Sequence, residues 1–340
     1  MIQQLPFVLL NNIFGFLNPE LCQWKILITI CKELYVNRYN ISWQSLLQFK
    51  IRNVENIYQL TSFTHIKNLS IVWMNLTDNE LETITNLPYL EYLDLSGSNI
   101  TDYYIKFLPK SIKYLQLSRC HIFGRHLNKF TNLETLILDF CNNLLSHHIP
   151  ILPKLKHLDV TYCKKLIGIP YIASLEKLIF DGCEINNVEF PKTIKYLSMA
   201  GSNINNNLLK FTQLTHLNVS SCINIDDTSM ELIAKITQLT NLNLSKCKKI
   251  TDAGIKQLNN LKNLTNLKIT SIQLTDVCLN YLPKTIEYLD VSGCPFTKDC
   301  IETIKTMKKL KIMHMSFCPN LFYFHVRKEL PHINYDLPYQ

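Results

Sequence analysis

The chain has 340 residues, an apolar content of 47% and a formal net charge of +8. The apolar content is normal for a soluble protein, and the charge is too modest to indicate nucleic-acid binding by itself. No uninterrupted apolar stretch approaches the roughly 20 residues that span a bilayer, so the sequence predicts no transmembrane helix.

The first segment is apolar but differs from a secretory signal. Pro6, Asn11 and Asn12 interrupt the run from Met1 to Leu17, and no lysine or arginine precedes it. We therefore expect a cytoplasmic protein, with the nucleus as the alternative compartment. In either compartment the 12 cysteines should stay reduced.

Residues 1–45, before the linker, contain the spacing of an amphipathic helix. Leu9, Ile13 and Leu17 recur every four residues, which places them on one face of a helix. Residues 46–65 are predicted to continue as a helical linker that also caps the segment that follows.

From residue 66 onward the pattern L-x-x-L-x-L recurs twelve times. Its leading residues are 19 to 25 positions apart, which is the leucine-rich-repeat period. They are Ile66, Leu90, Ile112, Leu133, Leu155, Leu175, Ile194, Leu214, Leu239, Leu264, Ile286 and Leu310. The sequence therefore predicts an α/β solenoid over residues 66–318, in which each repeat contacts only its neighbours. Residues 319–340, which are rich in aromatics, are predicted to cover the last strand as a C-terminal cap.

Within each unit the alternation of apolar and polar residues predicts a short strand. Leu158 and Val160 point to one face, and His157 and Asp159 point to the other. Parallel strands lie about 4.8 Å apart, whereas packed helices need about 8–10 Å. A curved parallel sheet is expected, with helices and turns on its convex side.

In eight units a cysteine follows the last apolar position by three residues. These cysteines are Cys120, Cys141, Cys163, Cys183, Cys222, Cys247, Cys294 and Cys318. We interpret them as buried thiols that bond backbone groups in the turn, and we expect Ser98 and Ser202 to form similar bonds in two other units. Zinc sites usually bring ligands in close C-x-x-C pairs, and the sequence has none. No metal and no cofactor are predicted.

The segments that return between strands differ along the solenoid. Thr77, Thr251 and Thr275 each precede an aspartate at the start of an amphipathic stretch, which is an N-cap signal for a convex helix. Two middle units, beginning at Leu175 and Ile194, are only 19 and 20 residues long. They predict a thinner middle with turns or extended chain on the convex side.

The cysteine-bearing repeat followed by Ile250-Thr251-Asp252 resembles the cysteine-containing subclass of leucine-rich repeats, which is best known from F-box proteins. Leu5-Pro6 resembles the opening of an F-box, and Ser42-Trp43 resembles its end. The resemblance implies a small all-helical domain over residues 1–45, with an adaptor-binding surface formed by Leu5, Pro6, Leu9, Leu10, Ile13, Phe14, Leu17, Leu21, Cys31 and Lys32.

By this resemblance the chain is expected to be the substrate-recognition subunit of a Skp–cullin–F-box ubiquitin ligase. The implied partners are a Skp-type adaptor, through it a cullin–RING ligase, and an unknown protein substrate. No chemistry is required of such a subunit. The sequence has no Walker loop, no Gly-rich dinucleotide turn and no H-E-x-x-H pair, so we do not expect an enzyme.

The substrate is expected on the concave side chains, because aromatic residues and arginine are the usual hot spots of protein interfaces. The candidates are Tyr92, Tyr114, Arg119, Asp139, Phe140, His157, Asp159, Tyr162 and Asp181. The three aspartates suggest a ligand with basic or hydrogen-bond-donating groups. At any single position the alternative is an ordinary solvated strand residue.

Two other functions are weighed against the ligase subunit. The first is a stand-alone repeat scaffold, inhibitor or decoy in which residues 1–45 only cap the solenoid. The second is a polyanion binder using the lysine-rich turns, which is disfavoured because these lack regular aromatic platforms. The abundance of Asn, Ile, Lys and Tyr is typical of AT-rich coding, as in amoebae and their large DNA viruses. For a viral chain the expected compartment is the host-cell cytoplasm.

Overall fold

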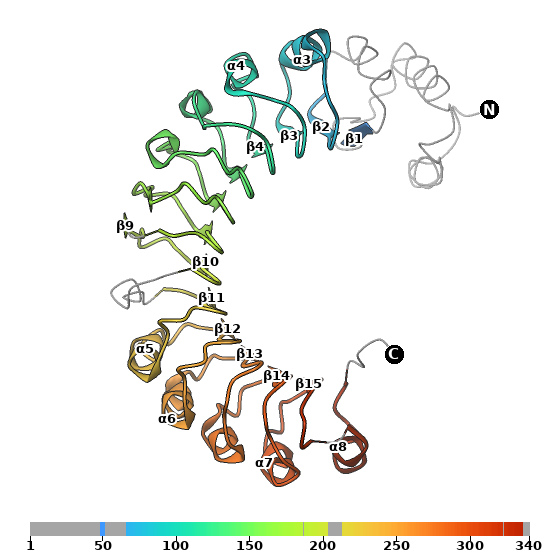
Figure 1. Cartoon of the computed structure of the whole chain (residues 1–340), viewed down its shortest axis with the longest axis vertical. Helices are drawn as coiled ribbons and strands as arrows, with labels where there is room; N and C mark the ends of the chain where they lie inside the picture. The colour runs from blue at the N-terminus through green and yellow to red at the C-terminus, as the bar shows by residue number, and fades with distance from the viewer. Residues whose placement is uncertain (1–47, 52–65, 186, 203–212, 322, 336–340) are drawn as a thin grey trace, which may run out of the picture.

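The fold is defined by a computed structural model that describes residues 48–51, 66–185, 187–202, 213–321 and 323–335. The chain from residue 66 follows an open arc, with strands on the inner side and helices or turns on the outer side (Figure 1). The ten predicted adaptor-binding residues, between Leu5 and Lys32, lie outside the described residues.

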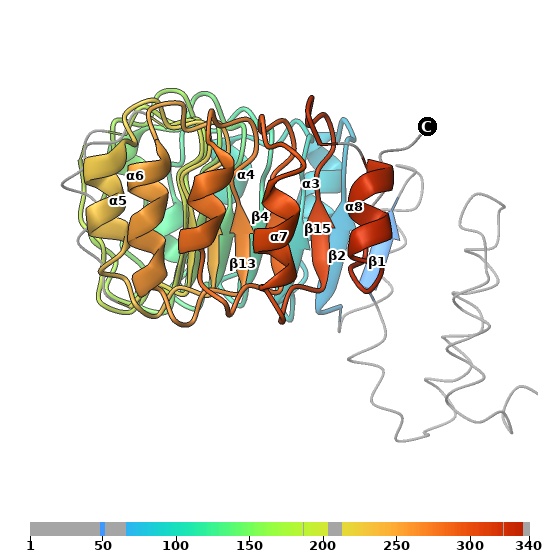
Figure 2. The ribbon, with the colours of Figure 1, turned by 90° about the horizontal axis from the view of Figure 1, so that it is seen from below.

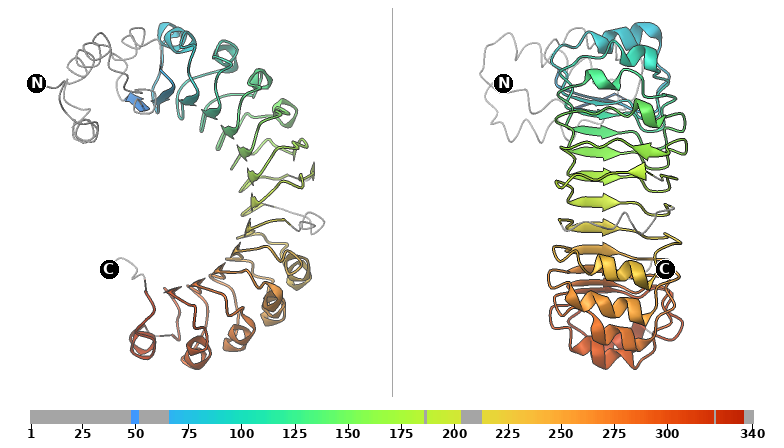
Figure 3. Two further views of the ribbon diagram at one scale, coloured as in Figure 1. Left: turned by 180° about the vertical axis from the view of Figure 1, so that it is seen from behind. Right: turned by 90° about the vertical axis from the view of Figure 1, so that its left-hand side faces the viewer.

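The inner side is one parallel sheet of 13 strands whose order in space is their order in the chain. Figure 3 shows these strands stacked in a single file. The strands are β1 (Gln48–Ile51), β2 (Asn68–Ile71), β3 (Tyr92–Asp94), β4 (Tyr114–Gln116), β5 (Thr135–Ile137), β6 (His157–Asp159), β8 (Lys177–Ile179), β10 (Tyr196–Ser198), β11 (His216–Asn218), β12 (Asn241–Asn243), β13 (Asn266–Lys268), β14 (Tyr288–Asp290) and β15 (Ile312–His314). Neighbouring strands are in register, so that Leu93 pairs with Leu115 and Leu115 with Leu136. The predicted curved parallel sheet is confirmed.

Strand β1 corrects one prediction. The sequence suggests a helical linker over residues 46–65, but residues 48–51 pair in parallel with β2 along all four positions. The helical prediction is therefore wrong at these residues. An edge strand presents a row of unpaired N–H and C=O groups, and pairing with β1 satisfies those of β2.

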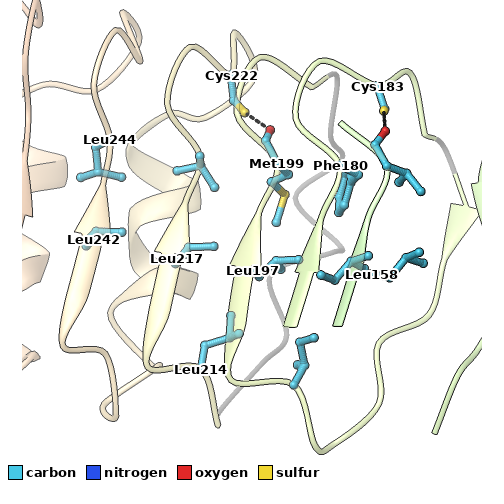
Figure 4. Close-up of a cluster of buried hydrophobic side chains, with 14 of the residues drawn as sticks. Leu158, Phe180, Cys183, Leu197, Met199, Leu214, Leu217, Cys222, Leu242 and Leu244 are labelled. Carbon is cyan, nitrogen blue, oxygen red and sulfur yellow. Dashed lines mark hydrogen bonds between the residues drawn. The ribbon is translucent and has the colours of Figure 1, made fainter. Parts of the chain in front are cut away.

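The core lies between the sheet and the outer segments, and the repeat pattern builds it directly. All twelve leading apolar residues are buried, from Ile66 to Leu310. Figure 4 shows the central strand leucines Leu197, Leu217 and Leu242 on neighbouring strands, with 0 to 2% of their surface exposed. Because each repeat supplies the same residues at the same height, the core is continuous along the arc.

The predicted backbone bond is confirmed for all eight cysteines, and the predicted burial for seven of them, since Cys318 is half-buried. Each Sγ donates to a backbone carbonyl of the preceding repeat; Cys141 reaches the Leu117 oxygen at 3.0 Å and Cys163 the Leu138 oxygen at 3.1 Å. The dashed lines in Figure 4 mark the same bond at Cys183 and Cys222. Burial raises the pKa of the Cys120 thiol to about 11 and that of Cys247 to about 12, so these groups stay protonated at neutral pH.

Serine forms the predicted bond to the backbone in one of the two units. The Ser202 hydroxyl donates to the Phe180 carbonyl at 3.0 Å. Ser98 is buried at the matching position, but its hydroxyl has no hydrogen-bond partner among the described residues, so the prediction is wrong there.

Short helices cover the outer side toward both ends of the arc. They are α3 (Asp78–Thr85), α4 (Asp102–Ile105), α5 (Asp227–Ile233), α6 (Asp252–Lys256), α7 (Cys300–Lys305) and α8 (Tyr323–Glu329), with 3-10 turns η4 (Leu127–Lys129), η5 (Ser146–His148), η7 (Gln257–Asn260) and η8 (Asp276–Tyr281). Figure 2 shows α5, α6, α7 and α8 on the outer side. Thr77 and Thr251 cap α3 and α6 as predicted, whereas the segment after Thr275 is the 3-10 helix η8. None of the described helices has the length and hydropathy of a membrane span.

The middle of the outer side is thinner, as the short repeats predict. It holds the two-stranded parallel ladder of β7 (Gly168–Ile169) and β9 (Asn187–Val188) where the ends of the arc carry helices. Residues 203–212, in the other short unit, lie outside the described residues.

The C-terminal residues form a further unit against the last strand. Val326 and Leu330 are buried, and Asn334 forms a parallel bridge with Ile312 of β15. Figure 1 shows α8 next to α7 on the outer side. This unit covers the end of the core that β15 would otherwise expose.

Candidate protein-binding face

The turn that follows each strand has the same backbone conformation, and these turns form one edge of the concave face. In every repeat the residue just before the cysteine position, here called the turn residue, has a positive φ of 54° to 70°. From Trp73 to Gly293 its amide donates to a carbonyl of the next repeat, as from Phe140 to Thr161 at 2.7 Å. Glycine or asparagine is usual in this conformation, and a bulky residue is rare. Trp73, Arg119, Phe140 and Tyr162 are therefore exceptions, and their side chains project at the same place in their repeats.

These four side chains form the aromatic–arginine ridge. The Arg119 guanidinium carbon lies 4.1 Å from the Phe140 ring centroid and 5.9 Å from that of Trp73. The rings of Phe140 and Tyr162 are stacked with centroids 4.9 Å apart. Trp73 is 68% exposed and Tyr162 45% exposed, so the ridge offers aromatic surface to solvent. Such a combination is typical of interface hot spots.

Two glycines make room for the rings of the ridge in the next turn along the arc. A Cβ on Gly97 would come within 2.4 Å of a Trp73 ring carbon, and one on Gly182 within 2.4 Å of a Tyr162 ring carbon. Because both turns lack a side chain, the indole and phenol rings occupy that space. The ridge with these two turns spans six consecutive repeats.

A second aromatic contact lies on the strands themselves. Tyr92 and Tyr114 face each other across β3 and β4, with stacked rings 4.2 Å apart. The Tyr114 hydroxyl donates to Gln116 Oε1 at 2.8 Å. Burial raises the pKa of both phenols, so both remain neutral hydroxyl groups at physiological pH.

Carboxylates lie on the same strands and the turns that follow them. Asp159 accepts the Thr161 amide at 2.9 Å, and Asp181 accepts the Ala200 amide and the Ser198 hydroxyl, both at 2.6 Å. Asp139 accepts the Ser118 hydroxyl. Burial raises the pKa of Asp139 and Asp181 from the ordinary aspartate value.

His157 occupies the centre of this region. Burial lowers the pKa of its imidazole to about 4, and the charge of Lys177 on the strand beside it acts in the same direction. Its Nε2 is buried without a hydrogen-bond partner among the described residues. The side chain is therefore neutral at pH 7.

The structure brings the sequence candidates into contact in two groups. Arg119, Phe140 and Tyr162 belong to the ridge, and Tyr92 and Tyr114 form the separate stack. Sequence reasoning missed Trp73, although a signal exists. Met74 takes the cysteine position in the first repeat, and the residue before it must then be the turn residue.

The turn histidines pack locally. The rings of His147 and His148 are 4.1 Å apart, and His148 Nδ1 lies 3.0 Å from the Phe123 carbonyl oxygen. Over the part of the chain that the structure describes, no three His, Cys, Asp or Glu side chains gather as a metal ion would require.

Comparison with known proteins agrees with the leucine-rich-repeat fold that the repeat period predicts. A family model described as Leucine Rich repeat matches residues 86–102 and 236–258. A search of the curated proteins found no match. Among solved structures, an internalin from Listeria monocytogenes is similar over 82% of each chain, with 21% identity and a TM-score of 0.61.

A chain of the mouse RP105/MD-1 complex is also similar, with 18% identity and a TM-score of 0.56. The similarity covers 80% of the present chain and 51% of that chain, which is about half of its length. These levels of identity bear on the fold alone. The described part of the chain is a leucine-rich-repeat solenoid.

Proposed function

We propose that the protein is a non-catalytic scaffold that binds a partner protein on the N-terminal half of its concave face. The observation that carries this proposal is the aromatic–arginine ridge. Trp73, Arg119, Phe140 and Tyr162 occupy positions where the backbone favours glycine, and the rings of Trp73 and Tyr162 are exposed. Because the conformation recurs in every repeat, what singles out the ridge is the run of three large side chains in contact at Arg119, Phe140 and Tyr162.

The scaffold proposal is tested by partner capture with a double substitution. Phe140→Ala with Tyr162→Ala removes the stacked pair, and we expect the proteins retained by the wild-type chain to be retained at least about tenfold less, the loss typical of a hot spot. Quantitative mass spectrometry after affinity purification measures the change. Circular dichroism and the melting temperature should stay close to wild type, because neither ring lies in the core.

The matched control is Phe317→Ala. Phe317 is also a turn residue with positive φ and is 88% exposed, but it lies in the last repeat, far along the arc. Its loss should leave capture unchanged. Undiminished capture by the folded double variant would remove the ridge as the binding site.

We also propose a finer function, in which the bound protein is a substrate presented to a Skp–cullin–F-box ubiquitin ligase. The support is the F-box resemblance of residues 1–45 and the repeat class that follows it. In this mechanism the chain acts by position alone, because it holds a substrate lysine near the charged ligase partner. The ligase function would place the protein in the cytoplasm or nucleus, or in a host cell if the chain is viral.

A pull-down with a purified Skp-type adaptor tests the ligase proposal. Wild-type protein should retain the adaptor, and Leu9→Asp with Ile13→Asp should lose it, because two carboxylates would disrupt an apolar helix face. Unchanged melting of the repeat domain controls for folding. Absence of adaptor binding by the wild type would instead favour the stand-alone scaffold, inhibitor or decoy.

A further inference from the structure

The concave face is divided by charge. Strands β3 to β8 and their turns carry Asp94, Asp139, Asp159 and Asp181, all in the repeats that the ridge spans. At the positions that match Asp94 and Asp159, strands β10 to β13 carry Ser198, Asn218, Asn243 and Lys268. Asp290 on β14 is the other aspartate in this register among the described strands. Four of the five carboxylates at these strand and turn positions therefore lie beside the aromatic surface.

The fold does not require this charge. Asp94 and Asp159 each accept the amide two residues later, at 3.0 and 2.9 Å. Asn218 and Asn243 make the same bond at 3.1 and 3.0 Å with a neutral amide side chain. A neutral acceptor therefore closes the turn as well, and the negative charge needs another explanation.

The carboxylates beside the ridge are also outside the ion pairs, although the charge of Arg119 acts on Asp139 and favours its ionised form. Where strands begin, at the other end of the sheet, Glu91, Glu134 and Glu176 pair with lysines of neighbouring repeats at 2.8 to 3.2 Å. The lysines and arginines that the structure describes form no such ion pair with Asp94, Asp139, Asp159 or Asp181. Two of the four, Asp139 and Asp181, are partly desolvated, so a cation supplied from outside would interact with them more strongly than in bulk water.

One cation of the chain already lies on an aromatic ring of the ridge. The Arg119 guanidinium lies over the Phe140 ring at 4.1 Å, which is a favourable cation–π geometry. The Tyr162 ring is stacked on Phe140 and is 45% exposed, so it extends the aromatic surface available to such a side chain.

We propose that the occupant of the N-terminal concave face is an extended protein segment that bears lysine or arginine. This inference rests on the proposed scaffold function and names the chemistry of its partner. The cationic heads would lie against Asp94, Asp139, Asp159 and Asp181, and the aliphatic stems against the ridge. The strands that carry these carboxylates are one or two positions apart in the sheet, about 4.8 to 9.6 Å. Side chains on one face of an extended chain recur about every 6.6 Å, which lies within that range, so cations at alternate residues would be within reach of successive carboxylates.

Fluorescence anisotropy with the full chain tests the proposal. The probe is a twelve-residue peptide of alternating Arg and Ser, compared with Gln–Ser and Glu–Ser peptides. We expect only the Arg–Ser peptide to bind, with an affinity that falls as salt is raised. Substituting Asn at Asp94, Asp139, Asp159 and Asp181 keeps an acceptor for each turn bond, and it should weaken binding at least about tenfold.

Asp290→Asn is the matched control, because Asp290 makes the same turn bond on β14, to the Ser292 amide at 3.1 Å. It should bind the Arg–Ser peptide as the wild type does. Equal binding by the fourfold Asn variant, or preference for the Glu–Ser peptide or for single-stranded RNA, would overturn the proposal.

Partner capture separates failure of this inference from failure of the scaffold function. Partners lost in the Phe140→Ala, Tyr162→Ala variant but fully retained by the fourfold Asn variant would uphold the scaffold and refute the cationic segment. Partners retained by both variants would refute both proposals. Loss in both variants is the result that we expect.

Discussion

At the residue scale, one turn position decides what the edge of the concave face displays. The backbone conformation there is the same in all twelve repeats, yet the residue is glycine in four of them and Trp, Arg, Phe or Tyr in the ridge. A side chain at positive φ costs about 1 kcal/mol or more relative to glycine. Gly97 and Gly182 contribute by lacking a side chain, which leaves room for the neighbouring Trp73 and Tyr162 rings.

Gly182→Ala tests the dependence of the ridge on these glycines. The new Cβ would meet the Tyr162 ring at 2.4 Å and would also sit at a φ of +66°, so we expect a loss of about 2 kcal/mol in unfolding free energy and a displaced ring. Gly201→Ala is the control, because its φ is +64° but a Cβ there would have no atom within 4 Å. It should cost only the backbone part, about 1 kcal/mol. Urea unfolding measures both, and equal losses would show that Tyr162 does not depend on Gly182.

At the element scale, neighbouring repeats are joined by side chains as well as by the sheet. At the strand starts Lys67, Glu91 and Lys113 alternate in sign, and Glu91 pairs with both lysines. Threonine takes this position at residues 215, 240 and 265, where the Thr240 hydroxyl donates to the Thr215 carbonyl at 3.0 Å, and the charged pair returns at Glu287 and Lys311. Exposed ion pairs stabilise little, but a slip by one repeat would place like charges opposite each other. The alternating charges at the strand starts therefore specify the order of the repeats more than they add stability.

A second junction joins the outer helices. Asp227, the first residue of α5, accepts the Thr251 amide at 2.9 Å and the Thr251 hydroxyl at 2.6 Å, and Thr251 is the N-cap of α6. Asp276 makes the same pair of bonds to Thr297. In these C-terminal repeats an aspartate at the start of one convex segment thus links it to a threonine of the next.

Asp227→Ala should lower the unfolding free energy by about 1–2 kcal/mol, because two hydrogen bonds at the start of α6 are lost. Asp299→Ala is the control. Asp299 is exposed and precedes α7 without a side-chain capping bond, so its loss should change stability by less than about 0.5 kcal/mol. Chemical denaturation of the full chain distinguishes the two, and equal effects would argue against the junction.

At the scale of the whole molecule, a solenoid is only as stable as its ends. The core runs without interruption along the arc, and the unit that contains α8 closes it with Leu321, Val326, Leu330 and Ile333. Each repeat is stabilised by its neighbours. Loss of the final unit should therefore destabilise β15 most, and the destabilisation should decrease with distance along the arc.

Leu330→Ala should therefore loosen one end and not the whole molecule. The side chain is 1% exposed, and its truncation should cost about 2–3 kcal/mol, at the low end for leucine because a terminal unit can relax. Hydrogen–deuterium exchange should accelerate in residues 310–335 and stay unchanged in residues 66–200. Lys328→Ala, at an exposed position of α8, should change neither region. A uniform acceleration along the chain would contradict the nearest-neighbour picture.

The sequence by itself determined the solenoid, its twelve strands from β2 onward, the inward leucines and the buried thiols. It could do so because each repeat stacks on the same residues of the next, so that spacing along the chain becomes spacing in space. It also selected Arg119, Phe140 and Tyr162, because residue type alone marks interface candidates. Only the tertiary structure decided how these side chains meet.

That decision depends on long-range geometry. The ridge exists because turns about 20 residues apart share a left-handed backbone conformation, which brought in Trp73 and gave Gly97 and Gly182 their roles. Strand β1 replaced the predicted helix because the edge of β2 offered backbone partners that no local pattern reveals. The carboxylates beside the ridge became informative only when Asn218 and Asn243 were seen to close the same turn without charge.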